Sequence, residues 1–125
     1  MASEIQFNIT FSAAKGGAAT SSINRTTPAD MTGTGMGDLV QLAGHAADSA
    51  LALPGSVTGN YWVMVYNMDP TNFVSISTGT GGAFAAAVFA VVPAGLTAGP
   101  FLCTRSLYVK ADTADCNIFS TLCQA

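Results

Sequence analysis

The chain has 125 residues, of which 50% are hydrophobic and only 9% are charged, whereas an ordinary soluble domain carries about 25% charged residues. This length predicts one domain and excludes a multidomain enzyme. The net charge of −3 leaves no basic surface for phosphate groups, which excludes nucleic acid as a partner. High hydrophobicity with low charge also excludes intrinsic disorder.

The polar residues are mostly Ser, Thr and Asn, and they are distributed with Gly along the whole chain. Hydroxylated and β-branched residues with frequent Gly are typical of strands and turns, whereas the residues that build solvated helix faces are nearly absent. The composition therefore predicts an all-β fold.

The first predicted strand is the clearest, because apolar and polar residues alternate over residues 5–12. This period of two predicts a strand with one buried face. The alternation follows Glu4 and is unlike the continuous apolar core of a signal peptide, so we expect a protein made and kept in the cytoplasm. Residues 20–27 are polar and predict a loop or an exposed edge strand, within an extended or loop segment over residues 12–37.

The middle of the chain contains one firm strand. Residues 61–68 are apolar at both odd and even positions, which predicts a strand covered on both faces. A shorter strand is expected over residues 39–42. Residues 44–53 fit either one helical turn or a strand that ends at Pro54.

A turn follows at residues 67–72, where Pro70 suits the second position and Asp69 can accept a hydrogen bond from a later backbone N–H. Residues 73–78 then predict a return strand, which we expect to pair with residues 61–68 as a hairpin. Further strands are expected at residues 83–92, 101–104, 107–110 and 116–123, with turns at 93–95 and 111–115.

Seven or eight short strands separated by Gly, Pro and Asn turns predict an antiparallel, jelly-roll-like β-sandwich, as a single domain over residues 1–125. The main alternative is a membrane span over the uncharged residues 83–103. A span needs about 20 apolar residues in succession, and two prolines and two glycines interrupt this stretch. We therefore expect no membrane insertion.

Three glycine-rich stretches, at residues 15–17, 33–38 and 79–84, lack the residue order of a phosphate-binding loop or a dinucleotide fingerprint. Their position between predicted strands indicates turns. Asp112 and Asp115 flank the last turn and could coordinate a cation, but Asp residues in turns usually accept local backbone N–H groups. A hard cation also needs several converging oxygen ligands, so no metal site is expected.

His45 is the single histidine, and neither a Gly-x-Ser-x-Gly elbow nor a cysteine signature accompanies it, so no catalytic site is predicted. A zinc site is not expected, because Cys103, Cys116 and Cys123 lack the short spacing of structural zinc ligands. We expect three reduced, buried cysteines. Cys116 and Cys123 have opposite parity on one predicted strand, so they cannot pair with each other.

Two glycosylation motifs, at Asn8 and Asn24, are interpreted as coincidental without a signal peptide. Trp62 with its neighbours Tyr61, Tyr66 and Phe73 could form a ligand platform, but their place in the most apolar strand favours core packing. No catalytic residue, cofactor or metal ligand is therefore assigned.

One combination of motifs is more specific. An apolar strand runs into an Asn-x-Asp-x-Thr-Asn turn and a return strand over residues 59–76, followed in order by Gly81-Gly82, the turn at 93–95 and residues 107–114. In these features the chain resembles small virion structural proteins of tailed bacteriophages, of the capsid-decorating or cement type. The resemblance implies a β-sandwich or jelly roll that binds the outside of a capsid shell, often as a trimer, without catalysis.

The resulting prediction is a virion structural protein, made in the host bacterial cytoplasm, that decorates and stabilises a phage capsid. Its expected partners are the major capsid protein and further copies of itself, with a trimer favoured. The low charge agrees, because faces that are buried in a symmetric assembly need few charges. The alternatives are a tail-tip or fibre module that binds a host receptor or glycan through Trp62 and the tyrosines, and a hydrolase that uses His45.

Overall fold

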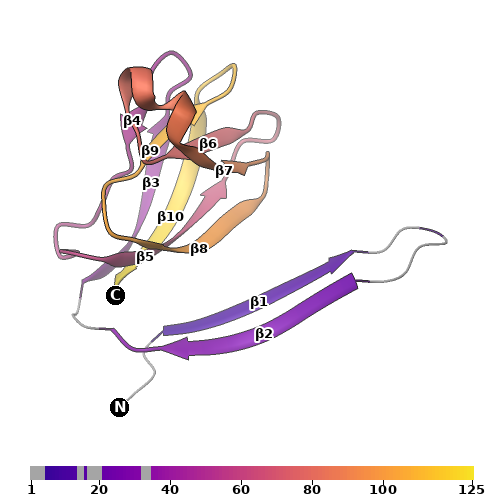
Figure 1. Cartoon of the computed structure of the whole chain (residues 1–125). Helices are drawn as coiled ribbons and strands as arrows, with labels where there is room; N and C mark the ends of the chain where they lie inside the picture. Colours follow the sequence, from indigo (N-terminus) through magenta and orange to yellow (C-terminus); the bar gives the residue numbers. More distant parts are fainter. Residues whose placement is uncertain (1–4, 14–15, 17–20, 32–34) are drawn as a thin grey trace. The chain divides into compact units, whose positions relative to one another are not determined.

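The structure is a computed structural model, and it describes residues 5–13, 16, 21–31 and 35–125. The chain divides into two compact units, Met1–Thr32 and Gly33–Ala125. Figure 1 shows their strands. Within the described part of the chain, no helix is long and apolar enough to cross a membrane.

The first unit is a two-stranded antiparallel hairpin of β1 (Ile5–Ala13) and β2 (Ser21–Ala29). The predicted first strand is confirmed, and of the two interpretations of residues 20–27 the strand is the one observed. The predicted burial of one face holds only at Ile5, which is 7% exposed, whereas Ile9 is 40% and Phe11 is 61% exposed. A two-stranded sheet has no second layer of its own to cover an apolar face.

The second unit is an antiparallel β-sandwich of two four-stranded sheets, with strand orders β3-β10-β5-β8 and β4-β9-β6-β7. Its first strand pairs with its last, and successive strands alternate between the sheets except at β6 and β7. This connectivity is that of an eight-stranded jelly roll. The strands are β3 (Met36–Ala43), β4 (Ser49–Ala50), β5 (Tyr61–Asn67), β6 (Val74–Ser77), β7 (Val88–Val92), β8 (Thr97–Cys103), β9 (Tyr108–Ala111) and β10 (Cys116–Gln124).

The predicted all-β, jelly-roll-like sandwich is confirmed in this unit. The prediction placed it over residues 1–125, whereas its first strand begins at Met36 and the hairpin strands belong to the other unit. The core lies between the two sheets. Its largest fully buried apolar side chains are Tyr61, Ile76, Ile118, Val63, Val65, Val74, Val92 and Val109.

The predicted hairpin of residues 61–68 and 73–78 is wrong, because β5 and β6 belong to different sheets. The intervening turn carries the chain across the sandwich, and Asn67 holds it there. The Asn67 side chain is fully buried; its Nδ2 donates to the carbonyl oxygens of Asn72 (2.8 Å) and Val92 (3.1 Å). Its Oδ1 accepts the backbone N–H of Asp69 at 3.0 Å. The amide nitrogen and the amide oxygen of this buried side chain therefore both have hydrogen-bond partners.

The same turn confirms the acceptor role predicted for Asp69. Its Oδ1 accepts the backbone N–H groups of Thr71 (2.7 Å) and Asn72 (2.6 Å). These bonds lower the pKa of Asp69, the Asn72 N–H being the largest cause. The polar residues of the Asn-x-Asp-x-Thr-Asn motif therefore stabilise the crossover between the sheets.

The strand predicted over residues 83–92 is only partly correct. The 3-10 helices η1 (Gly81–Ala83) and η2 (Ala85–Ala87) precede β7, which begins at Val88. Ser77 explains the difference, because its Oγ donates to the Phe84 carbonyl oxygen at 2.8 Å and accepts the Gly79 N–H at 3.0 Å. These bonds hold the segment in tight turns. Residues 44–53 form bends around the two-residue β4.

Candidate interaction surface

The most unusual surface of the sandwich is the side of the β3-β10-β5-β8 sheet that faces away from the core. Along β5 and β10, residues such as Val63 and Ile118 are buried and alternate with more exposed ones. Because side chains alternate across a strand, the intervening residues lie on the other side. We call this side the outer sheet face; it comprises Met36, Asp38, Val40, Leu42, Trp62, Met64, Tyr66, Thr97, Leu102, Asn117, Phe119, Thr121 and Cys123.

The strand register arranges these side chains in rows. Val40, Phe119 and Tyr66 are directly opposite one another across three strands. A second row continues across all four strands and consists of Met36, Cys123, Trp62 and Leu102. Val40 is 63% exposed and Leu102 is 52% exposed, so the rows form an apolar surface.

Between the two rows lies a polar spot. The Thr121 hydroxyl donates to Asp38 Oδ1, and the two residues are opposite each other on β10 and β3. Asp38 is the one charged residue among the described side chains of the outer sheet face. The surface therefore suits an apolar partner that brings a single cationic group to the position of Asp38.

Two predictions about this strand are corrected by the structure. Residues 61–68 were expected to be covered on both faces, and Trp62 and Tyr66 were expected in the core. Tyr66 is instead 39% exposed, Phe73 is also exposed, and Trp62 is half-buried on the outer side. Only the predicted core position of Tyr61 is confirmed: its hydroxyl donates to the Arg105 carbonyl oxygen at 3.0 Å, and burial raises its pKa.

The contribution of β3 and β8 to this surface was missed. A sequence signal existed in Leu39, Val40 and Leu42, which are apolar at both odd and even positions of the strand. Such a pattern shows that both sides of a strand are apolar, but it does not show which side the rest of the chain covers.

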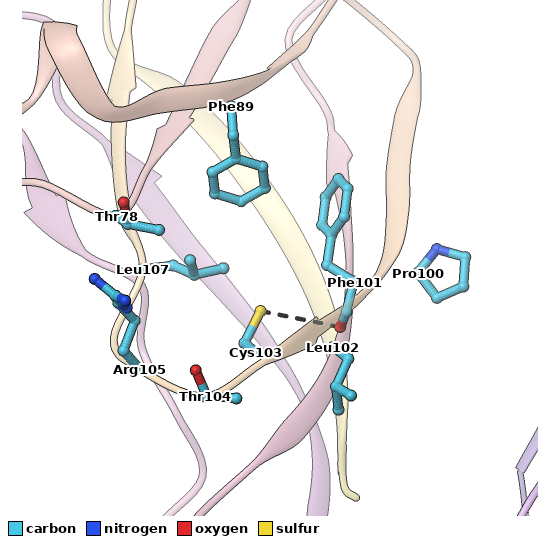
Figure 2. A pocket seen from close by; sticks show the side chains of 9 residues that line it. All are labelled: Thr78, Phe89, Pro100, Phe101, Leu102, Cys103, Thr104, Arg105 and Leu107. Atoms are coloured by element: carbon cyan, nitrogen blue, oxygen red, sulfur yellow. Dashed lines mark hydrogen bonds between the residues drawn. The ribbon is translucent and has the colours of Figure 1, made fainter.

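A pocket of about 410 Å³ lies beside β7 and β8, which are the edge strands of their sheets. Figure 2 shows its lining residues. Phe89 and Phe101 make an edge-to-face contact with ring centroids 5.2 Å apart. Arg105 is the charged residue in a lining that otherwise consists of Thr78, Pro100, Leu102, Cys103, Thr104 and Leu107.

Cys103 lines this pocket, but its thiol is not activated as a nucleophile. Burial raises the pKa of the Cys103 thiol, and its Sγ–H donates to the Phe101 carbonyl oxygen at 3.9 Å. All three cysteines are free. Cys116 points into the core and Cys123 to the outer sheet face, which confirms their opposite parity but corrects the predicted burial of Cys123, since it is only half-buried.

The structure brings His45 to one of the predicted turn carboxylates. His45 Nδ1 and Asp115 Oδ1 are 2.6 Å apart, and the His45 backbone N–H donates to the same oxygen at 3.0 Å. The hydrogen bond from the His45 ring is the largest cause of the lowered pKa of Asp115. Both side chains are about half exposed, and the pair joins the end of β3 to the loop before β10.

Other predicted features have ordinary structural places. The Gly-rich residues 79–84, predicted as a turn, contain the short 3-10 helix η1, whereas parts of the stretches 15–17 and 33–38 lie outside the described residues. Asn8 Oδ1 accepts the Thr26 hydroxyl at 3.0 Å on the hairpin. Among the residues that the structure describes, no three His, Cys, Asp or Glu side chains are grouped closely enough to hold a metal ion.

Comparison with known proteins adds no relative: no family model matches the chain, and neither a curated protein nor a solved structure is significantly similar to it.

Proposed function

We propose that this chain is a virion structural protein that binds the outside of a phage capsid shell as a decoration or cement subunit and stabilises it. Its proposed partners are the major capsid protein and further copies of itself, with a trimer favoured. The observation that carries this proposal is the outer sheet face, whose two exposed apolar rows flank a single charged residue, Asp38. Monomeric soluble proteins rarely expose contiguous apolar patches of this kind, whereas assembly subunits bury them.

Two further points support the proposal. The jelly-roll connectivity agrees with the fold that the resemblance to decoration proteins implies. The motif of residues 67–72, which carries part of the resemblance, also has a clear structural role, because it forms the crossover between the two sheets. The motif therefore supports the fold, while the outer sheet face supports the role in an assembly.

The test is binding of the purified protein to phage shells that lack it. We expect the protein to sediment with the shells and to raise the temperature at which they disrupt. Val40→Asp places a charge in an apolar row that the proposed assembly buries, against the shell or against another copy, and it should weaken shell binding strongly. Ala114→Asp, in the exposed turn before β10, should not. A wild-type protein that does not sediment with any shell contradicts the proposal.

A second candidate function is a tail-tip or fibre module that binds a host receptor or glycan. The position of Trp62 and Tyr66 on the outer sheet face favours it, because aromatic rings offer flat apolar surfaces to a ligand. The number of copies in each particle discriminates the two functions: a shell subunit is present in the many copies that the lattice dictates, and a tail-tip protein in only a few. Glycan binding that is lost in Trp62→Ala would support the module.

A further inference from the structure

The hairpin of β1 and β2 has two chemically different faces. In its register, Ile9 is opposite Arg25 and Phe11 is opposite Ile23, and residues opposite each other in an antiparallel pair share one face. We call this the hairpin apolar face, and Phe7 and Thr27 belong to it as well. The other face carries Gln6, Asn8, Thr10, Asn24 and Thr26, which are all polar and exposed.

The hairpin apolar face is incomplete as it stands. Ile9, Phe11 and Ile23 are all exposed, although the strict alternation of β1 is typical of a strand that packs against another layer. An isolated two-stranded hairpin is marginally stable in water, and packing of one face against a further layer stabilises it. A second layer is therefore needed, and its surface should be apolar.

The outer sheet face meets this requirement, and its charge also complements the charge of the hairpin apolar face. Both surfaces are pleated sheets with rows of apolar side chains, which can pack face to face about 10 Å apart. The one charge on the hairpin apolar face is Arg25, and the one charge on the outer sheet face is Asp38. Among the described residues, neither belongs to an ion pair, so the two single charges are complementary and available to each other.

We propose that the hairpin of one copy packs with its apolar face on the outer sheet face of a second copy, with Arg25 paired to Asp38. Every copy then gives one hairpin and receives one. Such a contact joins two different surfaces, so repetition of it builds a closed ring when the rotation between copies closes and an open filament when it does not; the favoured trimer is the closed case. This inference rests on the proposed oligomeric subunit and identifies the surfaces that build the oligomer.

The first experiment measures the oligomeric state of the full-length protein by light scattering over a range of concentrations. Arg25→Glu and Asp38→Arg should each raise the dissociation constant about 10-fold or more, since a like-charged pair replaces an attractive one. The double variant Arg25→Glu/Asp38→Arg should restore the oligomer, which also shows that the single variants fold. Asp112→Arg, in the exposed turn before β10, is the matched control and should leave the oligomer intact.

The second experiment locates the contact with a short bismaleimide crosslinker. Ile23→Cys on the hairpin should crosslink to the native Cys123 of another copy and give dimers and larger species on a denaturing gel. Cys103 and Cys116 are buried and should react slowly. Two controls should remove the crosslink: Thr26→Cys on the polar face, and Cys123→Ser in the Ile23→Cys background.

The outcomes separate this inference from the proposed function. A monomeric wild type, an oligomer that ignores both charge reversals, or an Ile23→Cys crosslink within one chain overturns the hairpin contact. If Val40→Asp abolishes shell binding while Arg25→Glu leaves the oligomer unchanged, the capsid protein occupies the outer sheet face, and only the hairpin contact fails. An oligomer that depends on Arg25 and Asp38 but binds no shell keeps the contact and contradicts the proposed function.

Discussion

The two sheets of the sandwich share one core but differ on their outer sides. On the β4-β9-β6-β7 sheet, Ser75 and Lys110 are paired on adjacent strands, and the η1–η2 segment closes over Ser77, which is fully buried. On the β3-β10-β5-β8 sheet, the outer side consists of apolar rows with a single charge. Exposed apolar side chains are therefore grouped in rows on the outer sheet face, and this is the surface that the proposed assembly would bury.

The largest expected effect tests whether the outer sheet face contributes to the fold itself. Ile118 is fully buried, so Ile118→Ala should lower the free energy of unfolding by about 2–5 kcal/mol. Val40 is exposed and lies opposite Phe119, the residue after Ile118, and Val40→Ala should change that free energy by only about 0.5 kcal/mol. Urea denaturation at low protein concentration measures both. Equal losses would show that the outer side is as important for the fold as the core.

The crossover between the two sheets should be nearly as sensitive. Asn67→Ala leaves the carbonyl oxygens of Asn72 and Val92 without their donor, and we expect a loss of about 2–3 kcal/mol in the free energy of unfolding. Asn60→Ala, in the exposed turn before β5, is the control and should be almost neutral. A stable Asn67→Ala variant would mean that the turn does not depend on the buried amide.

A smaller effect should distinguish the two outer sides by their affinity for apolar probes. Val40→Lys should reduce the fluorescence of a hydrophobic dye and raise the solubility limit, because it interrupts an apolar row. Ser75→Lys on the other sheet should change neither measurement. If both variants behave alike, the contrast between the two sheets is not a contrast in exposed apolar surface.

The smallest effect concerns the stability of the protein at acidic pH, through a hydrogen-bonded carboxyl that holds η1 beside the β4-β9-β6-β7 sheet. Asp48 accepts the Thr80 hydroxyl (2.5 Å) and the Gly81 N–H (3.1 Å), and the Thr80 bond is the largest cause of its lowered pKa. A carboxyl whose pKa is lower in the folded state contributes stability above its unfolded pKa, near 4, and loses it as the pH falls through the folded pKa.

The melting temperature should therefore fall between about pH 4 and pH 2, in part through Asp48. Asp48→Asn should have a lower melting temperature than the wild type at pH 6 and a smaller decrease on acidification. Asp69 and Asp115, whose pKa values are also lowered, keep some of the pH dependence in the variant. An identical pH profile for wild type and Asp48→Asn would show that the Thr80 bond does not anchor η1.

The strands and several turns could be predicted from the sequence because they depend on neighbouring residues. Alternation located β1, an apolar run located β5, and the acceptor role of Asp69 was visible because its partners lie two and three residues away. Composition and strand count were enough for an all-β sandwich, since few other architectures accommodate so many short strands.

The partners of those strands were decided only by the tertiary structure. Whether β5 turns back as a hairpin or crosses to the other sheet depends on Asn67 and Val92, which are 25 residues apart. The pairing of His45 with Asp115 spans 70 residues, and no local pattern encodes it. In β5, both sides are apolar in sequence, so only the packing of the sheets shows that Val63 belongs to the core while Met64 and Tyr66 face outward. Local preference determines which residues form strands, whereas the layer that each side of a strand meets depends on contacts distant in sequence.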